Sequence, residues 1–196
     1  MDASNLAASQ PSAEPFLESS DAAASSPVQI NRRAQQRILG GHPWVYRSDV
    51  LALPAGQPKT VAVAGPDGQL LGRALLSPRS QIVLRMVSRG REGFDVAELQ
   101  GRLRAAILRR RLLLGEVSAC RLVHGEADFL PGLFVDRYAD ALVVQSTCAG
   151  SDAWVAACVE ALRAQLRPRL VVLRNDIGAR AHEGLDRGVH LLHGAK

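Results

Sequence analysis

The spacing of hydrophobic positions divides the chain into two parts that are built differently. Between residues 43 and 88, short β-prone runs are separated by turn residues. Residues 59–64 alternate between apolar and polar positions, and residues 65–68 (GPDG) are a strong turn signal. Residues 69–76 would form the returning strand, so that the whole segment predicts a hairpin. Residues 80–87 also alternate and predict a further strand. Several short strands in so small a space predict a compact β-barrel or sandwich.

After residue 94 the apolar positions recur at steps of three and four, which is typical of a helix with one buried stripe. Asp95 and Glu98 have the spacing of a capping box, so the helix is predicted to begin there, and Gly115 is a natural end. The predicted buried stripe consists of Val96, Leu99, Leu103, Ala106 and Ile107.

The remainder of the chain predicts strands that alternate with helices. The predicted strands are 120–124, 133–136, 141–147, 169–174 and 189–192, the predicted turn is 138–140, and the predicted helices are 152–166 and 176–184. The expected fold class is therefore α+β: a small β-barrel followed by an α/β domain with two main helices.

The first residues have a different composition. Residues 1–28 are mostly Ala, Ser, Pro and acidic residues without apolar periodicity, and we expect a disordered tail there, because such a segment cannot offset the entropy of ordering. Asn31 is a candidate N-cap for a short helix that ends before residues 40–41. Three basic residues would lie on this helix: Arg32, Arg33 and Arg37.

The positive charge is concentrated in one third of the chain. Residues 31–115 carry fifteen Lys and Arg against five Asp and Glu, a net +10, whereas residues 1–30 sum to −4 and residues 116–196 to −1, which gives +5 for the chain. Such a field attracts a polyanion, with an affinity that falls as salt rises; the alternative is a solvated basic surface without a partner.

The composition also indicates where the protein works. No apolar run approaches the roughly 20 residues that a membrane span needs, and the first 30 residues lack the Lys or Arg of a secretory signal. The three cysteines form no CxxC pair and are better suited to a reducing compartment. We therefore expect a cytoplasmic protein without a membrane partner.

Two loops supply further candidate contacts for a nucleic acid. His42 lies on a Gly-Pro turn and Arg47 at the end of the next strand, where each could meet a phosphate or a base edge; Trp44 and Tyr46 between them are expected to pack in the core. In the loop at residues 77–81 the polar residues Ser77, Ser80 and Gln81 lie close to the last two candidate contacts, Arg73 and Arg79; the alternative is an exposed loop with incidental arginines.

The stretch from residue 122 to 138 places titratable residues in an otherwise apolar run. His124, Glu126, Asp128 and Asp136 could form a metal or acid/base cluster, but no second His and no nucleophile accompany them. We expect hydrogen bonds that brace the loop, with Asp136 and Arg137 joined in a turn.

Neither a cofactor site nor a catalytic residue is predicted in this sequence. The glycine pairs lack the strand, Gly-x-Gly and helix context of a nucleotide-binding loop. We interpret Cys120, Cys148 and Cys158 as small hydrophobic residues and not as nucleophiles.

Four segments carry a family resemblance. Residues 37–47 (RILGGHPWVYR), 72–85, 121–138 (RLVHGEADFLPGLFVDRY) and 174–185 (RNDIGARAHEGL) resemble, in order and spacing, the large-subunit ribosomal RNA cytosine-5 methyltransferases, which are class I S-adenosylmethionine-dependent enzymes. Two positions depart from the family pattern: Phe129 stands where glycine is usual, and Leu76-Ser77 replaces an aromatic-Asn pair.

The resemblance covers residues 29–196 and implies a domain order. It implies an RNA-binding PUA domain at 29–92 and a central α/β domain at 93–196, with the Rossmann-like domain that holds S-adenosylmethionine and the catalytic cysteine expected beyond this sequence. The chain is then expected to bind ribosomal or other structured RNA without transferring methyl groups by itself. The alternatives are the front part of a complete methyltransferase and a scaffold for dimerisation or docking.

Overall fold

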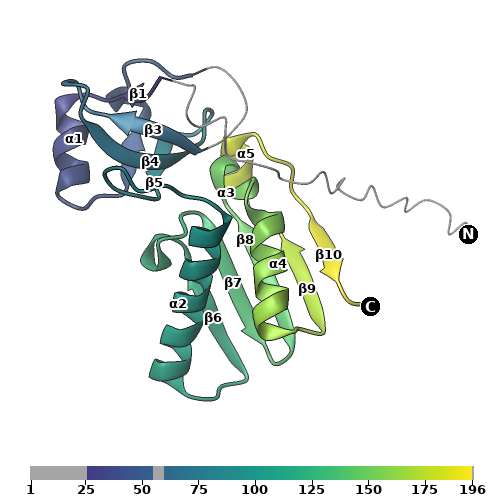
Figure 1. Cartoon of the computed structure of the whole chain (residues 1–196). Coiled ribbons are helices and arrows are strands. Elements are labelled where there is room, and N and C mark those ends of the chain that lie inside the picture. Colours follow the sequence, from purple (N-terminus) through teal and green to yellow (C-terminus); the bar gives the residue numbers. More distant parts are fainter. Residues whose placement is uncertain (1–25, 55–59, 196) are drawn as a thin grey trace, which may run out of the picture.

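The computed structural model describes residues 26–54 and 60–195 and shows two units side by side (Figure 1). The tail predicted at residues 1–28 lies outside the described residues as far as residue 25, and its predicted end is wrong, because Val28 is buried and begins β1. The first unit contains strands β1 (Val28–Gln29), β2 (Trp44–Tyr46), β3 (Thr60–Ala64), β4 (Leu70–Leu76) and β5 (Ile82–Met86), with helix α1 (Arg32–Leu39) after β1.

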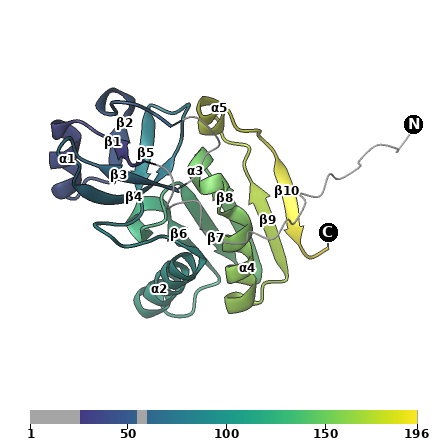
Figure 2. The ribbon, with the colours of Figure 1, turned by 45° about the horizontal axis from the view of Figure 1, so that its top comes forward.

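The first sheet has the strand order β1-β3-β4-β5-β2 and curls on itself (Figure 2). Its two ends meet where Ile30 bridges Val50, and the Leu51 N–H donates to the Gln29 carbonyl over 3.0 Å. The core inside this ring is formed by alternating strand residues and one face of α1. This nearly closed sheet agrees with the small barrel expected from the short alternating runs.

Helix α1 begins and ends where the sequence predicts. The side chain of Asn31 accepts a hydrogen bond from the Ala34 N–H over 2.9 Å and so caps the first turn. Ala34 and Ile38 face the core, while Arg32 and Arg33 are exposed. The cap and the one buried face together fix the direction in which the basic residues of this helix point.

The second unit is a five-stranded sheet with the order β10-β9-β8-β7-β6. Helices α2 and α4 lie together on one face of it (Figure 1). The parallel pair β8 and β9 is joined through α4, and the other neighbouring strands are antiparallel. The elements are α2 (Val96–Leu114), β6 (Ala119–His124), β7 (Leu133–Tyr138), β8 (Ala141–Ser146), α3 (Ala149–Asp152), α4 (Val155–Leu166), β9 (Leu170–Arg174), α5 (Ala179–Glu183) and β10 (Val189–His193).

The start of α2 confirms its predicted cap, with one correction to its buried stripe. The Asp95 carboxylate accepts from the Glu98 N–H over 2.8 Å. Leu99 and Leu103 are buried as expected, but Val96 is 38% exposed. Phe94, just before the cap, lies in the core instead and packs edge-on against Trp154 at 4.9 Å.

Two predicted boundaries in the second unit are wrong. The helix expected at 152–166 begins later, at Val155, and a separate short helix, α3, ends at Asp152, whose carboxylate binds Arg180 at 2.7 Å. The turn expected at 138–140 is shorter, since β7 continues to Tyr138 and Ala139 takes the left-handed conformation with φ of 51°. Both errors concern the ends of elements, which depend on contacts distant in sequence.

The two units share a tightly packed contact. Leu75 on β4 and Val87 after β5 belong to the hydrophobic core of the second unit. Gly150 in α3 lies against Leu75 so closely that a Cβ atom there would be 2.5 Å from the Leu75 Cβ. Across the same contact, buried Arg85 pairs with buried Glu183 at 3.3 Å, and Glu183 also accepts from the Ala149 N–H at 3.2 Å. This geometry fixes the orientation of the first unit on the second.

Candidate nucleic-acid interface

The basic residues predicted as contacts all lie on the first unit, but they do not form one cluster. Arg32 and Arg33 are exposed on α1, Arg73 is half-buried on β4, and Arg79 is exposed on the turn before β5. Among the described residues, none of these four has a carboxylate within ion-pair distance. They therefore keep their guanidinium groups available for phosphate oxygens.

Arg79 reaches across to the second unit. A Cβ atom on Gly184, the residue that ends α5, would lie 2.2 Å from the Arg79 Nη1. Gly184 also has φ of 69°, which favours glycine. Arg79 thus marks the line where the basic surface of the first unit meets α5.

Two predicted contact residues have internal partners. Arg37 pairs with buried Asp49, and its guanidinium lies 5.3 Å from the centre of the Tyr46 ring. Burial alone would raise the pKa of Asp49, but hydrogen bonds from Arg37 and Asn31 hold that pKa below its usual value. Arg47 donates to the carbonyls of Pro78 and Ser80, the latter at 3.1 Å. For Arg37 and Arg47, contact with RNA stays a prediction beside these structural roles.

The expectation that Trp44 and Tyr46 pack in the core is wrong. Only Val45, between them, points inward and is fully buried, because side chains alternate along the edge strand β2. Trp44 and Tyr46 are half-buried and lie outside both hydrophobic cores. The Trp44 Nε1 donates to the Glu126 carboxylate of the second unit over 2.8 Å.

His42 joins these two aromatic residues. Its ring lies 5.8 Å from that of Trp44, nearly perpendicular to it, and 6.4 Å from that of Tyr46. The backbone N–H of Trp44 donates to the His42 Nδ1 over 3.1 Å and so fixes the imidazole. With Arg37 stacked on Tyr46, these side chains form what we call the aromatic cluster, defined by Arg37, His42, Trp44 and Tyr46.

The sequence prediction missed one further basic residue at this place. Arg89 is exposed, and its Nη2 would lie 3.8 Å from a Cβ atom on Gly41, next to His42. Among the described residues it has no carboxylate within ion-pair distance. Arg89 belongs to the basic run at residues 85–91. This run contributes to the net charge of residues 31–115, but none of its arginines was predicted as a contact.

The acidic residues at 122–138 brace loops, as expected. Asp128 has a fully buried carboxylate that binds Arg110 at 2.6 Å, Arg109 at 3.0 Å and the His124 N–H at 2.7 Å. Burial would raise the pKa of Asp128, but the hydrogen bonds from Arg110 and His124 bring it below its usual value.

The predicted pairing of Asp136 with Arg137 is wrong. Asp136 lies opposite Arg121 in the register of β7 and β6, and the two side chains form a bidentate ion pair at 2.8 and 3.0 Å. Arg137 is the next residue along the strand and so points to the other face of the sheet, where it donates to the Ala139 carbonyl at 2.9 Å. Within residues 26–54 and 60–195, no group of three or more His, Cys, Asp or Glu is placed to hold a metal ion.

Phe129, which departs from the family pattern, lies in the left-handed region with φ of 58°. Replacing it with glycine is expected to raise the free energy of unfolding by at most about 1 kcal/mol, because that region costs an L-residue roughly 1–2 kcal/mol and the entropy of glycine offsets part of the gain. The ring is 66% exposed and loses little packing. Urea unfolding measures the difference. Phe129→Ala, which keeps the strain, serves as the control; a less stable glycine variant would contradict the expectation.

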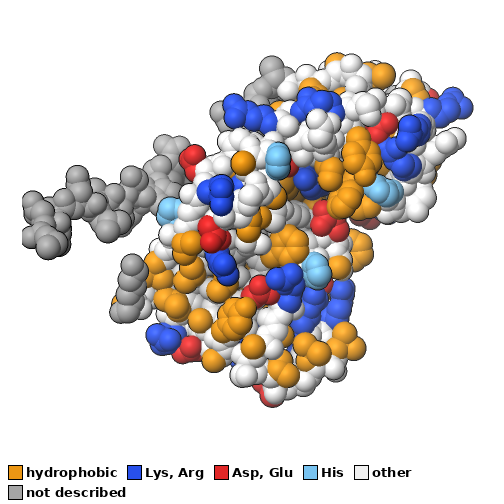
Figure 3. Space-filling model, turned by 180° about the vertical axis from the view of Figure 1, so that it is seen from behind, with side chains coloured by type: hydrophobic (Ala, Val, Ile, Leu, Met, Phe, Trp, Pro, Cys, Tyr) orange, Lys and Arg blue, Asp and Glu red, His pale blue; other side chains and the backbone are white. Residues whose placement is uncertain are grey.

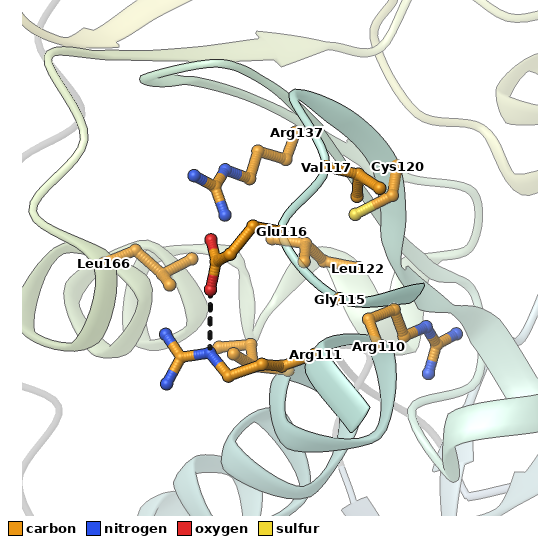
Figure 4. A pocket seen from close by; sticks show the side chains of 10 residues that line it. Arg110, Arg111, Gly115, Glu116, Val117, Cys120, Leu122, Arg137 and Leu166 are labelled. Carbon is orange, nitrogen blue, oxygen red and sulfur yellow. Dashed lines mark ion pairs between the residues drawn. The ribbon is translucent and has the colours of Figure 1, made fainter. Parts of the chain in front are cut away.

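One cavity of the second unit is too small for an organic ligand. The cavity at the C-terminal end of α2, lined among others by Arg111, Glu116, Cys120 and Arg137, has a volume of about 30 Å³, enough for about one water molecule (Figure 4). Arg111 and Glu116 form an ion pair of 3.9 Å at its side. Elsewhere, burial raises the pKa of Cys158 to about 12, which removes it as a nucleophile.

Comparison with known proteins agrees with the geometry of the first unit. Residues 28–89 match the family model described as a PUA-like domain. The first unit is a PUA-like domain. The basic residues of α1, β4 and the turn before β5 therefore all lie on this domain. Among the helices of the described residues, none is long and apolar enough to cross a membrane.

The chain is similar in sequence to proteins named ribosomal RNA large subunit methyltransferase I. The protein of Shewanella denitrificans is 36% identical over 173 residues, which cover 85% of this chain and 44% of the relative. That of Shewanella amazonensis is 38% identical with 85% and 43% covered, and that of Vibrio cholerae is 35% identical with 78% and 40% covered. The chain thus spans less than half the length of these relatives.

Two solved structures show the same fold. A Streptococcus mutans protein described provisionally as a SAM-dependent methyltransferase has a TM-score of 0.71 at 15% identity, over 88% of this chain and 44% of that one. A second protein, provisionally a methyltransferase and solved in complex with SAH, has a TM-score of 0.74 at 16% identity, over 88% and 43%. These likenesses show the arrangement of the two units found here.

Proposed function

We propose that this chain binds structured RNA, ribosomal RNA in particular, through its PUA-like domain. One observation carries the proposal: the arginines of this domain that face solvent are mostly without carboxylate partners. Figure 3 shows Lys and Arg side chains spread over this unit, beside hydrophobic and His side chains. Among the described residues, the arginines between 31 and 91 without an ion pair are Arg32, Arg33, Arg47, Arg73, Arg79, Arg89 and Arg91.

The distribution of ion pairs separates this surface from the second unit. On α2, Arg102, Arg109, Arg110 and Arg111 form ion pairs with carboxylates, whereas Arg104 has none among the described residues. An unbalanced arginine retains its attraction for phosphate, and each phosphate contact releases counterions. The names of the relatives support ribosomal RNA as the class of RNA.

The double variant Arg32→Ala/Arg33→Ala is expected to weaken RNA binding roughly tenfold at low salt and to reduce the slope of log K against log salt by up to about 2. The measurement is fluorescence anisotropy with a labelled ribosomal RNA hairpin. The control with the same change of charge is Arg163→Ala/Arg167→Ala at the end of α4 in the second unit. Equal losses for both double variants would assign the effect to net charge alone, and undetectable binding of the unaltered chain at 50 mM salt would sink the proposal.

We propose methyl transfer only at the level of the whole protein that the relatives represent, with S-adenosylmethionine as donor and cytosine carbon 5 as target. The cavity at the end of α2 is too small for this donor, since it has room for about one water molecule. Cys158 is buried with a raised pKa and cannot supply a thiolate. The part that we propose for the described residues is to hold the RNA. A cytoplasmic location stays a prediction.

A second candidate function is self-association through the end of α2. Four large hydrophobic residues there are exposed by 52–75%, which is unusual for a surface: Leu108, Leu112, Leu113 and Leu114. A second copy of the chain is the occupant to test, by light scattering at increasing concentration. A strictly monomeric chain would contradict this function.

A further inference from the structure

The aromatic cluster of the PUA-like domain is unusual because its rings belong to neither hydrophobic core. Its members Arg37, His42, Trp44 and Tyr46 come from the end of α1, the following turn and the outward face of β2. We propose that this cluster binds an unpaired RNA base by stacking, so that the RNA taken up by the domain contains a single-stranded segment. The inference rests on the proposed RNA binding and specifies its substrate.

The exposure of the two large rings is the first argument. Val45 alone provides the inward contact of β2 with the core, where it is fully buried. Trp44 and Tyr46 are held half-buried on the opposite face, outside both cores. These two rings belong to neither core, and each lies beside the His42 ring. Such rings offer π faces, and every base has a π face to stack on them.

The cluster is also held rigid before any ligand arrives. The Trp44 Nε1 donates to Glu126 at 2.8 Å, which fixes the indole, and the His42 Nδ1 accepts from the Trp44 N–H at 3.1 Å. The Arg37 guanidinium covers Tyr46 at 5.3 Å while its charge is balanced by Asp49. Arg37 is therefore a positioning residue. Side chains already fixed in place lose little entropy when a base stacks on them.

The backbone beside the cluster is open to a close approach. Gly41 has φ of 99°, a conformation that favours glycine, and a Cβ atom there would meet only the Arg89 Nη2, at 3.8 Å. A nucleotide whose base stacks on the rings would thus find bare backbone next to it, together with the guanidinium of Arg89, which has no ion pair among the described residues. Arg89 is the candidate for the phosphate of that nucleotide.

Duplex RNA does not present what this cluster can bind. In an A-form helix the bases are stacked on one another, and proteins contact mainly the backbone and the shallow groove. Arg32 and Arg33 on α1 can bind the phosphates of the RNA backbone whether the RNA is single-stranded or a duplex. The PUA-like domain is therefore expected to bind RNA in two ways. Its arginines bind any RNA, and its aromatic cluster binds only unpaired bases.

The test compares two RNA probes on the full chain. A labelled 12-nucleotide single strand without secondary structure and a 12-base-pair duplex are titrated, followed by fluorescence anisotropy at the same salt. Tyr46→Ala is expected to weaken binding of the single strand about 5- to 150-fold, the range for loss of one stacked base, and to change binding of the duplex less than about twofold. Tyr46→Phe keeps the ring and is expected to bind as the unaltered chain does.

A matched control and a second readout guard against a folding defect. Tyr138 is an exposed tyrosine on β7 of the second unit, 57% exposed, and Tyr138→Ala is expected to leave both affinities unchanged. In a Trp154→Phe background the indole of Trp44 is the one tryptophan of the chain. Its fluorescence should be quenched by the single strand and not by the duplex.

The outcomes are distinguishable. Equal binding of both probes, with Tyr46→Ala folded and unaffected, would overturn the stacking inference and leave the proposed RNA binding intact. Equal loss on both probes would also overturn it, because the ring would then support the domain and not a base. If the chain bound neither the single strand nor the duplex, the proposed function would be overturned together with the inference.

Discussion

Replacing Asp128 with asparagine is expected to lower the free energy of unfolding by about 3 kcal/mol and the melting temperature by roughly 10 °C. The carboxylate has no exposed surface and binds Arg109, Arg110 and the His124 N–H. Losing its charge leaves two guanidinium groups without their common partner in the segment between β6 and β7. Thermal and urea unfolding at neutral pH measure the loss.

The pH dependence of this effect has a defined sign. Because the folded pKa of Asp128 lies below its unfolded value of about 3.9, the carboxylate contributes its full stability above that value. The contribution is lost as the pH falls through the lower folded pKa. The difference between the two proteins should therefore be constant down to about pH 5 and shrink below about pH 4.

The control for this prediction is Asp136→Asn. Asp136 forms a bidentate pair with Arg121, but that pair is partly exposed, at 26% and 44% of the two side chains. Exposed pairs contribute at most about 1 kcal/mol. If Asp128→Asn and Asp136→Asn were equally mild, the buried arrangement at Asp128 would not stabilise the fold as described.

The second large effect concerns the contact between the two units. Glu183→Ala is expected to destabilise the chain by about 3 kcal/mol or more, because it leaves Arg85 buried without its carboxylate and removes the acceptor of the Ala149 N–H. Since that contact orients the PUA-like domain, its loss should also separate unfolding into two transitions in calorimetry.

A double replacement distinguishes charge from packing at this contact. Arg85→Met with Glu183→Leu exchanges the buried pair for apolar groups, which is often neutral or stabilising. We expect it to recover most of the stability and a single transition. Glu160→Ala, which breaks an exposed pair with Arg163 on α4, is the control and should cost less than about 1 kcal/mol. A single transition in Glu183→Ala would contradict the coupling.

Much of the fold was readable from local patterns. Asn31 and Asp95 cap helices because their side chains bond to the N–H three residues on, a contact set within one turn. Strand alternation predicted β3 to β5, and the family motifs predicted the PUA-like domain that residues 28–89 match. These signals act over a few residues, so no distant contact could override them.

The errors share the opposite cause. Asp152, where the helix at 152–166 was expected to begin, binds Arg180, 28 residues away. The partner of Asp136 is Arg121, 15 residues away on another strand. Trp44 and Tyr46 share one face of β2 and Val45 has the other, and which of the two faces meets the core is decided by packing against residues distant in sequence. The aromatic cluster was therefore visible in its residues but not in its exposure.

The place of Leu75 has a consequence for how such proteins change over time. Along β4, Ala74 and Leu76 lie in the core of the PUA-like domain, while Leu75 between them lies in that of the second unit. A single strand thus serves two interiors, and Gly150 leaves room for its side chain. Recombination that joins this PUA-like domain to a different neighbour would leave the Leu75 side chain without a core to enter. Leu75 and Gly150 are therefore expected to be inherited as a pair.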